Sequence, residues 1–531
     1  MPTLPSPGPG RIPSRFASIL PSLLAAALAA LGLMSEAGAP PTVRWTLLAA
    51  SAAIVLWNAL LVAAARRSMR ALQVEIVLRR QHYLQACAQG SVLLYWGWYW
   101  RPVYDAAPLI GAQLLFAYAF DMLLSWSRRD SYVLGFGPFP VIFSINLFLW
   151  FRPDWFYLQL LMVAAGFAAK ELIRWEREGR LVHIFNPSSF PLALVSLPLI
   201  VAGASDITRG QDIAISQFYP PQMYLMLFLI ALPGQLLFGV ASMTLSAVLT
   251  TYLYGLLYFA ATGTYLFYDS YVPIAVFLGM HLLFTDPSTS PRSELGRVVF
   301  GALYGLSAVG LYQLLGALGV PSFYDKLLQV PLLNLSVRRL DRLAGAKWLR
   351  PFDPMRLGRS LAPRQRYAAY ALLWAIAFVA LSVTGGLGDR HPGQWLPFWD
   401  QACQEGRPRA CAYLENLQAI YCGAGSGWAC NESGVFQRDR AGSDPSRQWS
   451  ALPAMNASFE RGCSLGFAPA CRNAGRLGTE SPAFERAPPT LADYPIVLRG
   501  SKGPITDRTP SSLHARACEQ GWRDTCGSAI R

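Results

Sequence analysis

The sequence predicts an all-α membrane protein: a polytopic membrane helix bundle with broken helices, followed by a small disulfide-stapled α/α-repeat domain. Hydrophobic residues make up 53% of the 531 residues and charged residues only 14%, which lies outside the usual range of soluble domains. Apolar stretches of membrane-spanning length recur as far as residue 385. Beyond residue 400 the composition changes, and eight of the nine cysteines lie there in evenly spaced pairs.

Thirteen apolar stretches are long enough, or nearly long enough, to cross a membrane. They are 16–34, 44–65, 88–104, 107–126, 134–151, 155–173, 188–203, 222–239, 241–262, 270–285, 298–318, 324–337 and 367–385. The shorter stretches are candidates for half-helices, and the first is expected to be an uncleaved anchor.

This pattern predicts four regions. Residues 1–86 hold N-terminal membrane segments and a basic cytoplasmic loop, and residues 87–345 form the main membrane domain. Residues 346–390 are a basic cytoplasmic linker with the last transmembrane helix, and residues 391–531 form the repeat domain.

The net charge of +14 comes almost entirely from arginine. These arginines lie in short clusters between apolar stretches rather than along one soluble face, so we expect a lipid bilayer and no nucleic acid as partner. Counting crossings puts every cluster on the cytoplasmic side, as the positive-inside rule requires. The count also places everything after about Gly386 outside the cytoplasm, in an integral protein of the bacterial inner-membrane type.

The cysteines support that topology independently. They form four pairs with one spacing: Cys403 with Cys411, Cys422 with Cys430, Cys463 with Cys471, and Cys518 with Cys526. Dense, regular cysteine pairs indicate disulfides in an oxidising compartment. A zinc site would need histidines or closer cysteine spacing, and only His391 and His514 occur in this region, so no metal is expected.

A short phrase occurs twice in the membrane domain, as Phe-Asn-Pro-Ser-Ser at 185–189 and Thr-Asp-Pro-Ser-Thr at 285–289. Proline interrupts backbone hydrogen bonding, which at membrane depth is tolerated only inside protein or beside a polar cavity. Two such breaks predict one site built from two halves. The candidate site residues in these phrases are Asn186, Pro187, Ser188, Ser189, Thr285, Asp286, Ser288 and Thr289. The alternative is that each phrase is an ordinary helix start with Asn or Asp as N-cap.

Other polar residues in apolar stretches are weaker candidates. Asp121 is either a functional group or a structural carboxylate, solvated or paired with Arg128. Asn146 is expected to form a hydrogen bond between helices. His183 and His281 each precede a phrase, where interfacial hydrogen bonding is favoured over ligand binding. No nucleotide-binding loop, catalytic triad or haem-attachment motif is visible, so no catalytic residue or enzymatic activity is assigned.

The stretches around both phrases resemble the NqrB/RnfD family of electron-transport membrane subunits. The resemblance rests on residues 182–190, on 284–291 with the glycine-spaced segment 296–305, and on the tail 331–341. It covers roughly residues 90–345. The family provides membrane subunits of sodium-pumping NADH:quinone reductase and of Rnf electron-transport complexes.

The resemblance implies a flavin cofactor, which in that family includes an FMN joined through its phosphate to a threonine. It also implies other electron-transport subunits as partners. The family's Ser/Thr-Gly-Ala-Thr attachment motif is absent from the corresponding loop, 204–212, where Thr208 is the only threonine. Thr208 is therefore the one candidate for attachment. The competing reading is a non-redox transporter, channel or membrane scaffold, because broken helices also build solute sites.

In the repeat region, a glycine follows the first cysteine of each pair by three residues, as in Ala-Cys-x-x-Gly-x-x-x-Ala-Cys at 402–411. Glycine ends a helix in a left-handed conformation, so the two sulfurs can meet across a tight helical hairpin. This frame resembles the secreted, cysteine-rich Sel-like branch of tetratricopeptide repeats, which implies a protein or peptide partner outside the cytoplasm. The repeats are unevenly spaced, and loops are expected within 432–460 and 476–512.

Overall fold

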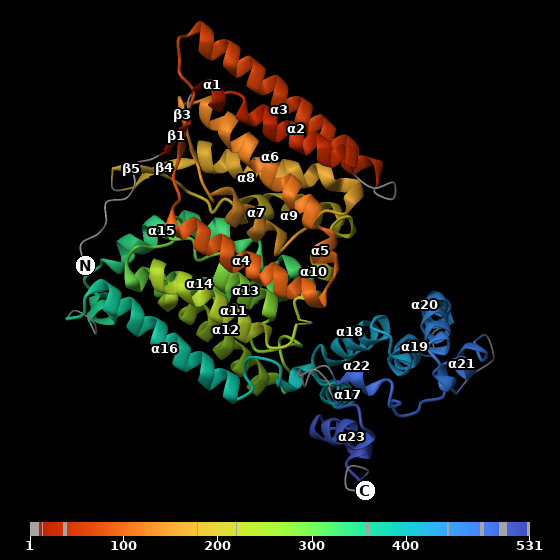
Figure 1. The fold of residues 1–531 in the computed structure, drawn as a ribbon. Coiled ribbons are helices and arrows are strands. Elements are labelled where there is room, and N and C mark those ends of the chain that lie inside the picture. Colours follow the sequence, from red (N-terminus) through yellow and green to blue (C-terminus); the bar gives the residue numbers. More distant parts are fainter. Residues whose placement is uncertain are drawn as a thin grey trace. The chain divides into compact units, whose positions relative to one another are not determined.

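The computed structural model of the protein is mostly helical (Figure 1). It describes residues 10–12, 14–34, 40–177, 179–218, 220–356, 360–442, 445–477, 483–498 and 507–527. The chain forms two compact units. Unit 1 comprises Met1–Thr251 and Ile274–Ala377, and unit 2 comprises Tyr252–Pro273 and Phe378–Arg531.

Most of unit 1 is α-helical. Its helices are α1 (Ser14–Ala17), α2 (Leu20–Met34), α3 (Pro41–Arg67), α4 (Arg80–Tyr99), α5 (Pro102–Asp105), α6 (Ala107–Trp126), α7 (Pro138–Asn146), α8 (Phe156–Leu172), α9 (Ser189–Ala202), α10 (Gly210–Ser216), α11 (Met223–Phe238), α13 (Ile274–Leu282), α14 (Glu294–Ala317) and α15 (Gln329–Ala344). The unit boundaries fall within two further helices, α12 (Ala241–Thr262) and α16 (Pro363–Val383).

Five helices of the described chain are long and apolar enough to cross a membrane: α3, α6, α12, α14 and α16. Three shorter apolar helices, α2, α9 and α11, match other predicted stretches. This is fewer than the thirteen predicted spans, because apolar content alone does not show where a helix ends. The stretches 134–151 and 270–285 contain only nine-residue helices, α7 and α13.

The predicted span at 324–337 is not one continuous helix. The structure has a short 3-10 helix there, Ser322–Lys326, and then α15, whose second half carries Arg338, Arg339, Asp341 and Arg342. Polar side chains on this helix hold the candidate site together, as shown below. The stretch is therefore divided between two helical segments rather than formed by one continuous helix.

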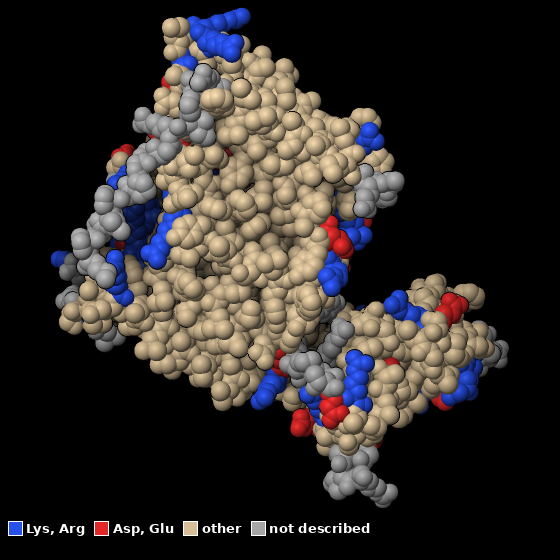
Figure 2. Space-filling view, in the orientation of Figure 1, with Lys and Arg blue, Asp and Glu red and all other residues tan. Residues whose placement is uncertain are grey.

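Unit 1 is built by helix packing in which small residues allow close approach. Helix α2 packs on α3 and α6, α6 packs on α8, and α4 packs on α7 and α11. A Cβ atom added to Gly305 of α14 would lie 2.7 Å from the carbonyl oxygen of Ala247 in α12, so glycine brings these two backbones together. On the face of unit 1 drawn in Figure 2, charged side chains lie mainly at the margins, as expected for a lipid-facing surface.

Five short strands in unit 1 were not predicted from the all-α pattern. Strand β2 (Gln73–Ile76) pairs antiparallel with β1 (Gly10–Ile12) and parallel with β3 (Ser131–Leu134). Strands β4 (Arg174–Arg177) and β5 (Arg180–His183) form an antiparallel hairpin. This hairpin leads directly into the first phrase and fixes the position of His183.

Unit 2 consists of helical hairpins. Its α-helices are α17 (Leu396–Gln404), α18 (Ala410–Gly423), α19 (Gly427–Ala441), α20 (Pro445–Ser464), α21 (Ala468–Ala474), α22 (Tyr494–Val497) and α23 (Pro510–Glu519), and short 3-10 helices lie at Pro392–Gln394 and Arg523–Thr525.

All four predicted cysteine pairs are disulfide-bonded. Three bonds join the end of one helix to the next helix across a short turn, and the fourth joins the end of α23 to Cys526, directly after the 3-10 helix Arg523–Thr525. The turn glycines Gly406, Gly425, Gly466 and Gly521 have φ values of +68°, +104°, +85° and +91°. The predicted left-handed turns are confirmed, and a side chain at these positions would strain the backbone.

Two features of unit 2 differ from the sequence-based prediction. Residues 432–460 are largely helical rather than looped, since α19 continues to Ala441 and α20 begins at Pro445. Buried Met455 and Phe459 anchor α20 despite its internal Pro453. In addition, the segment Tyr252–Pro273, which lies within the predicted membrane domain, contributes buried Tyr265 to the core of unit 2.

Candidate functional site

The first phrase forms a tight turn around the side chain of Asn186. The Asn186 Oδ1 atom accepts hydrogen bonds from the Ser188 backbone N–H at 2.9 Å, the Ser188 hydroxyl at 2.7 Å and the Ser189 backbone N–H at 3.1 Å. Helix α9 begins at Ser189, so Asn186 satisfies donors at the helix start. The turn at this phrase leads into a helix, but Ser188 and not Asn186 stands at the N-cap position.

The second phrase repeats the turn without a helix. The Asp286 Oδ1 atom accepts hydrogen bonds from the Ser288 backbone N–H at 3.0 Å and the Ser288 hydroxyl at 2.6 Å. The next helix, α14, begins only at Glu294. Since the same turn exists where no helix starts, capping alone does not explain why the phrase occurs twice.

Asn334 on α15 joins the two phrases. Its Oδ1 atom accepts the Asn186 backbone N–H at 3.0 Å, and its Nδ2 atom donates to the Thr289 carbonyl at 3.0 Å. Asn186 in turn donates from Nδ2 to the Leu283 carbonyl at 2.9 Å, just before the second phrase. The two halves therefore meet, as the repeated pattern predicts. Asn334 was not among the predicted site residues, although a single amide within the apolar run 331–335 was a usable signal.

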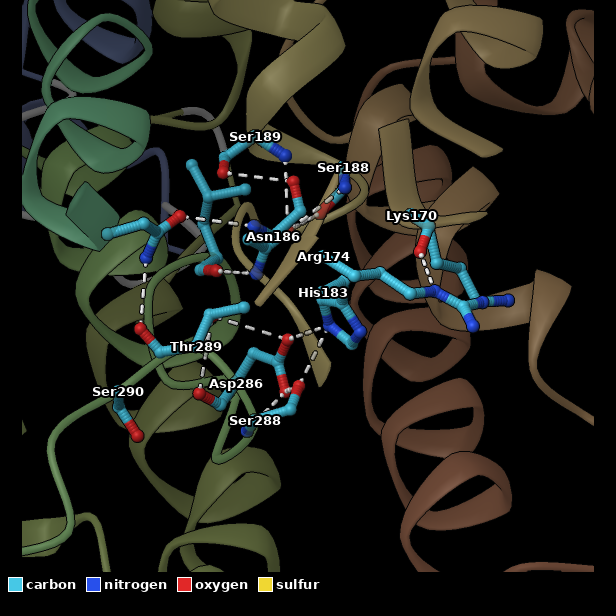
Figure 3. Close-up of polar contacts among 12 residues, drawn as sticks. Lys170, Arg174, His183, Asn186, Ser188, Ser189, Asp286, Ser288, Thr289 and Ser290 are labelled. Atoms are coloured by element: carbon cyan, nitrogen blue, oxygen red, sulfur yellow. Dashed lines mark hydrogen bonds and ion pairs between the residues drawn. The ribbon is translucent and has the colours of Figure 1, made fainter. Parts of the chain in front are cut away.

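His183, at the end of β5, adds a second connection (Figure 3). Its Nε2 atom lies 2.9 Å from the Ser288 hydroxyl and 3.5 Å from Asp286 Oδ2. Because the Ser288 hydroxyl donates to Asp286, the histidine nitrogen serves as the donor in this group. Burial alone would raise the pKa of Asp286, but the hydrogen bonds and charge from His183 and the bonds from Ser288 outweigh it and lower that pKa below its usual value.

Both phrases line one cavity of about 490 Å³. They contribute Asn186, Pro187, Ser188, Asp286, Pro287 and Ser288 to its wall. The remaining wall comes from α4, α6, α7, α8, β3, β5 and the segments beside them. The cavity has the size of a cofactor or small-molecule site.

Basic side chains outnumber acidic ones around this cavity. Arg79, Arg129, Lys170 and Arg174 line it together with Asp121, Glu171 and Asp286. Glu171 forms ion pairs with Arg129 at 2.7 Å and with Arg174, and Asp121 pairs with Lys170 at 3.4 Å.

Burial and two nearby cations affect a neighbouring histidine. Arg79 forms no ion pair with any residue that the structure describes. Burial, with Arg79 and Lys170 nearby, lowers the pKa of His82 to about 4. The cavity is thus an electropositive environment that favours an anionic group.

Four predicted site residues lie away from this cavity. Ser189 and Thr289 are buried behind the turns. The Thr208 hydroxyl donates to the Ser205 carbonyl at 2.8 Å and accepts the Gly210 backbone N–H at 3.3 Å, and Thr208 pairs with Phe151 in an isolated β-bridge. The structure does not bring Thr208 to the two phrases.

Thr285 lines a second cavity of about 220 Å³. Three buried acceptors also belong to residues in its wall: Gln89 Oε1, Gln235 Oε1 and His281 Nε2. None of these atoms has a hydrogen-bond partner among the described residues. Only a hydrogen-bond donor, such as water, satisfies such a lining.

The remaining polar residues in predicted spans have structural partners. Asp121 pairs with Lys170 and not with Arg128, which corrects the expected pairing. Asn146 exchanges hydrogen bonds with Gln113 on α6, at 2.8 and 3.2 Å. The predicted interhelical role of Asn146 is confirmed.

The apolar helices and the bridged hairpins define a helical membrane protein with a disulfide-containing region. No family model matches the chain, and no curated protein or solved structure matches it either. The candidate site therefore has to be interpreted from its own chemistry.

Proposed function

We propose that the protein is a membrane electron-transport component that binds a flavin, such as FMN, in the cavity between the two phrases. The observation that carries this proposal is the meeting of Asn186 and Asp286, about a hundred residues apart in the chain, at one electropositive cavity. The resemblance of the same stretches to the NqrB/RnfD family supports it. A bound flavin would supply one- or two-electron transfer.

The polar groups of the cavity match the two ends of FMN. Arg79, Lys170 and Arg174 are placed to bind a phosphate, since their charge is only partly neutralised by Glu171 and Asp121. The turn hydroxyl of Ser188 and the amide of Asn186 provide hydrogen-bonding groups for the polar edge of an isoalloxazine ring. A volume of about 490 Å³ accommodates a ligand of this size.

We propose non-covalent binding. A threonine that carries FMN through a phosphoester must present its hydroxyl to the ligand. The Thr208 hydroxyl is bonded on both sides to its own turn, and Thr208 is absent from the cavity wall.

The proposed topology places the basic end of unit 1, including the cavity, in the cytoplasm and the disulfide-bonded unit outside it. The arginine clusters and the four disulfides support this orientation from separate physical grounds. In this arrangement the Sel-like unit is an interaction domain for an extracytoplasmic protein or peptide. Other electron-transport subunits would supply and remove electrons.

The visible absorption spectrum of the protein, purified after expression with ample flavin, tests the proposal. We expect an oxidised-flavin spectrum that Asn186→Leu and Asp286→Leu abolish while membrane insertion is retained. Ser307→Ala on α14, whose hydroxyl bonds only within its own helix turn, is the matched control and should keep the chromophore. Flavin should leave on denaturation of both the wild type and Thr208→Ala.

A colourless protein would contradict the flavin proposal. It would favour a non-redox transporter, channel or scaffold, for which the nine-residue helices α7 and α13 provide the specific support. Flavin that survives denaturation of the wild type, but not of Thr208→Ala, would instead contradict non-covalent binding.

A further inference from the structure

Unit 2 contains a large groove that no part of the flavin proposal uses. It has a volume of about 940 Å³. Its wall comes from α17, α18, α19, the extended segment 486–489, Tyr494 and the last bridged pair. The groove therefore crosses several hairpins rather than lying within one.

Aromatic side chains form much of its surface: Trp395, Phe398, Trp428, Tyr494 and Trp522. Trp522 packs edge-on against Trp428 with ring centroids 5.2 Å apart. Such rings give a ligand apolar contact, and their faces attract cations.

The charges in the groove are predominantly acidic. Four carboxylates, Asp400, Glu432, Glu519 and Asp524, face two guanidinium groups, Arg486 and Arg523. Arg486 is shared between Glu432, at 3.6 Å, and Asp439, at 3.0 Å. The lining therefore has two more negative than positive groups, which complements a cationic ligand.

Three polar groups in the wall lack the partners that buried groups normally have. The Gln418 side chain is only 5% exposed, and its Oε1 atom accepts no hydrogen bond from the described part of the chain. The indole N–H groups of Trp395 and Trp522 likewise have no acceptor there. These three atoms have almost no accessible surface, so they belong to the buried part of the wall behind the groove.

We propose that this groove binds an extended peptide segment that carries a lysine or arginine side chain. The peptide backbone would run along the groove across the hairpins, and the cationic side chain would lie between the aromatic rings and Glu432. This inference rests on the proposed interaction role of unit 2 and is independent of flavin binding.

The ionisation of Glu432 gives the proposal a pH signature. Burial raises the pKa of Glu432 to about 7, with Asp400 and Asp439 acting in the same direction and Arg486 opposing them. A bound cation stabilises the carboxylate, so affinity should fall as the pH drops below about 7 and level off above it.

The test uses the full-length protein in detergent and fluorescence anisotropy of a labelled lysine-rich peptide. A peptide with glutamate in place of lysine and a neutral soluble oligosaccharide are the comparison probes. We expect saturable binding of the lysine peptide alone, weakened at least about tenfold by Glu432→Gln. Asp400→Asn with Asp524→Asn gives a second test on exposed side chains, in case Glu432→Gln disturbs folding.

Two controls change the same residue types outside the groove. Glu460→Gln and Trp449→Ala, both on exposed parts of α20, should bind the peptide as the wild type does. Non-reducing peptide mapping of each variant verifies the four disulfides, and the flavin spectrum of the same samples reports separately on unit 1.

Equal binding of the lysine and glutamate peptides would overturn the charge argument. Binding unaffected by both sets of groove variants would place the site elsewhere. Binding of the oligosaccharide in preference to the lysine peptide would show that the aromatic surface serves a glycan, and would also overturn the proposal.

Discussion

The two phrases of unit 1 and the groove of unit 2 differ in how their polar groups are satisfied. In the cavity, Asn186, Asp286, Asn334 and His183 bond one another and the surrounding backbone. In the groove, Gln418 and two indole groups have no partner among the described residues. The bonded turns of the two phrases keep their geometry without a ligand, whereas atoms without partners in the described chain, which the cavity wall also has at Gln89 and Tyr132, leave hydrogen-bonding capacity unused.

The two regions are also held together differently. Unit 1 joins distant segments through buried side-chain amides, each of which serves several backbone groups. Unit 2 also has such amides, since Asn431 and Asn473 bond each other and the Glu485 carbonyl, but it joins neighbouring helices through short covalent loops as well. Single substitutions should therefore have their largest effects at the amides of unit 1, and the following predictions test this ordering.

Asn186→Leu should cause the largest loss of stability, on the order of 3–5 kcal/mol. The substitution leaves three donors around the first turn and the Leu283 carbonyl without their partner in a buried site. Thermal unfolding in detergent, followed by circular dichroism, measures the loss. Asn186→Asp keeps the Oδ1 acceptor and should lose less. If Asn186→Leu unfolds at the same midpoint temperature as the wild type, the amide does not hold the phrases together.

Glu432→Gln should stabilise unit 2 in a pH-dependent way. The pKa of Glu432 is raised from its usual value of 4.5 to about 7. The wild type therefore loses stability as the pH rises from the unfolded pKa to the folded one, by roughly 3 kcal/mol in total. The amide removes this loss, so the variant should unfold at a higher temperature than the wild type at about pH 8.

The same measurement at acid pH completes this test. Below about pH 4 the wild-type carboxyl is protonated in both states, and the two midpoints should converge. Glu460→Gln, on an exposed carboxylate, should show no such pH dependence. A pH-independent difference for Glu432→Gln would mean that packing, and not charge, determines its effect.

Replacing both Cys422 and Cys430 by alanine should cost roughly 2–3 kcal/mol, because the bond closes a loop with a sequence separation of 8. Both sulfurs are buried, and the pair lies in the core of unit 2. Urea unfolding with and without reductant measures the effect: the reductant should destabilise the variant less than the wild type. Cys87→Ala, at the free cysteine of unit 1, is the control and should change little.

Much of this organisation could be predicted because it is local in the sequence. The Cys-x-x-Gly frame determines both the turn and the distance between sulfurs, so all four bridges followed from spacing alone. The Asn-Pro and Asp-Pro phrases specify their own turns in the same way. Apolar runs indicated the long helices, but not where α7 and α13 end, since a short helix and an extended segment have the same composition.

The parts that sequence reasoning missed depend on contacts between distant segments. Asn334 lies about 150 residues after Asn186 in the chain, and the sequence around Asn334 does not show that the two residues are in contact. Tyr265 lies in a loop of the predicted membrane domain, yet packs against His391 with ring centroids 4.3 Å apart. Thr208 was proposed because it was the only threonine in its loop, but local turn bonding places its hydroxyl elsewhere.

Asp286→Asn should have the smallest effect on stability, about 1 kcal/mol or less. The amide keeps an Oδ1 acceptor for the Ser288 backbone and hydroxyl, so the second turn is retained. The charge interaction with His183 is lost across 3.5 Å, and both side chains are 21% exposed, which allows solvent screening. The amide nitrogen also replaces the Oδ2 atom that accepts the Thr289 hydroxyl at 3.3 Å, a long and weak bond. Because the pKa of Asp286 is lowered, its contribution is present above the usual pKa and disappears as the pH falls through the lowered one.

Thermal unfolding of Asp286→Asn and wild type over that pH range should therefore show a small difference near neutral pH and none at strongly acid pH. Asp286→Leu, which removes the turn acceptor as well, should lose clearly more stability at every pH. If Asp286→Asn proves as damaging as Asn186→Leu, the second phrase depends on its charge rather than on its turn. The two phrases would then share their local geometry, but hydrogen bonds would stabilise the first and charge would stabilise the second.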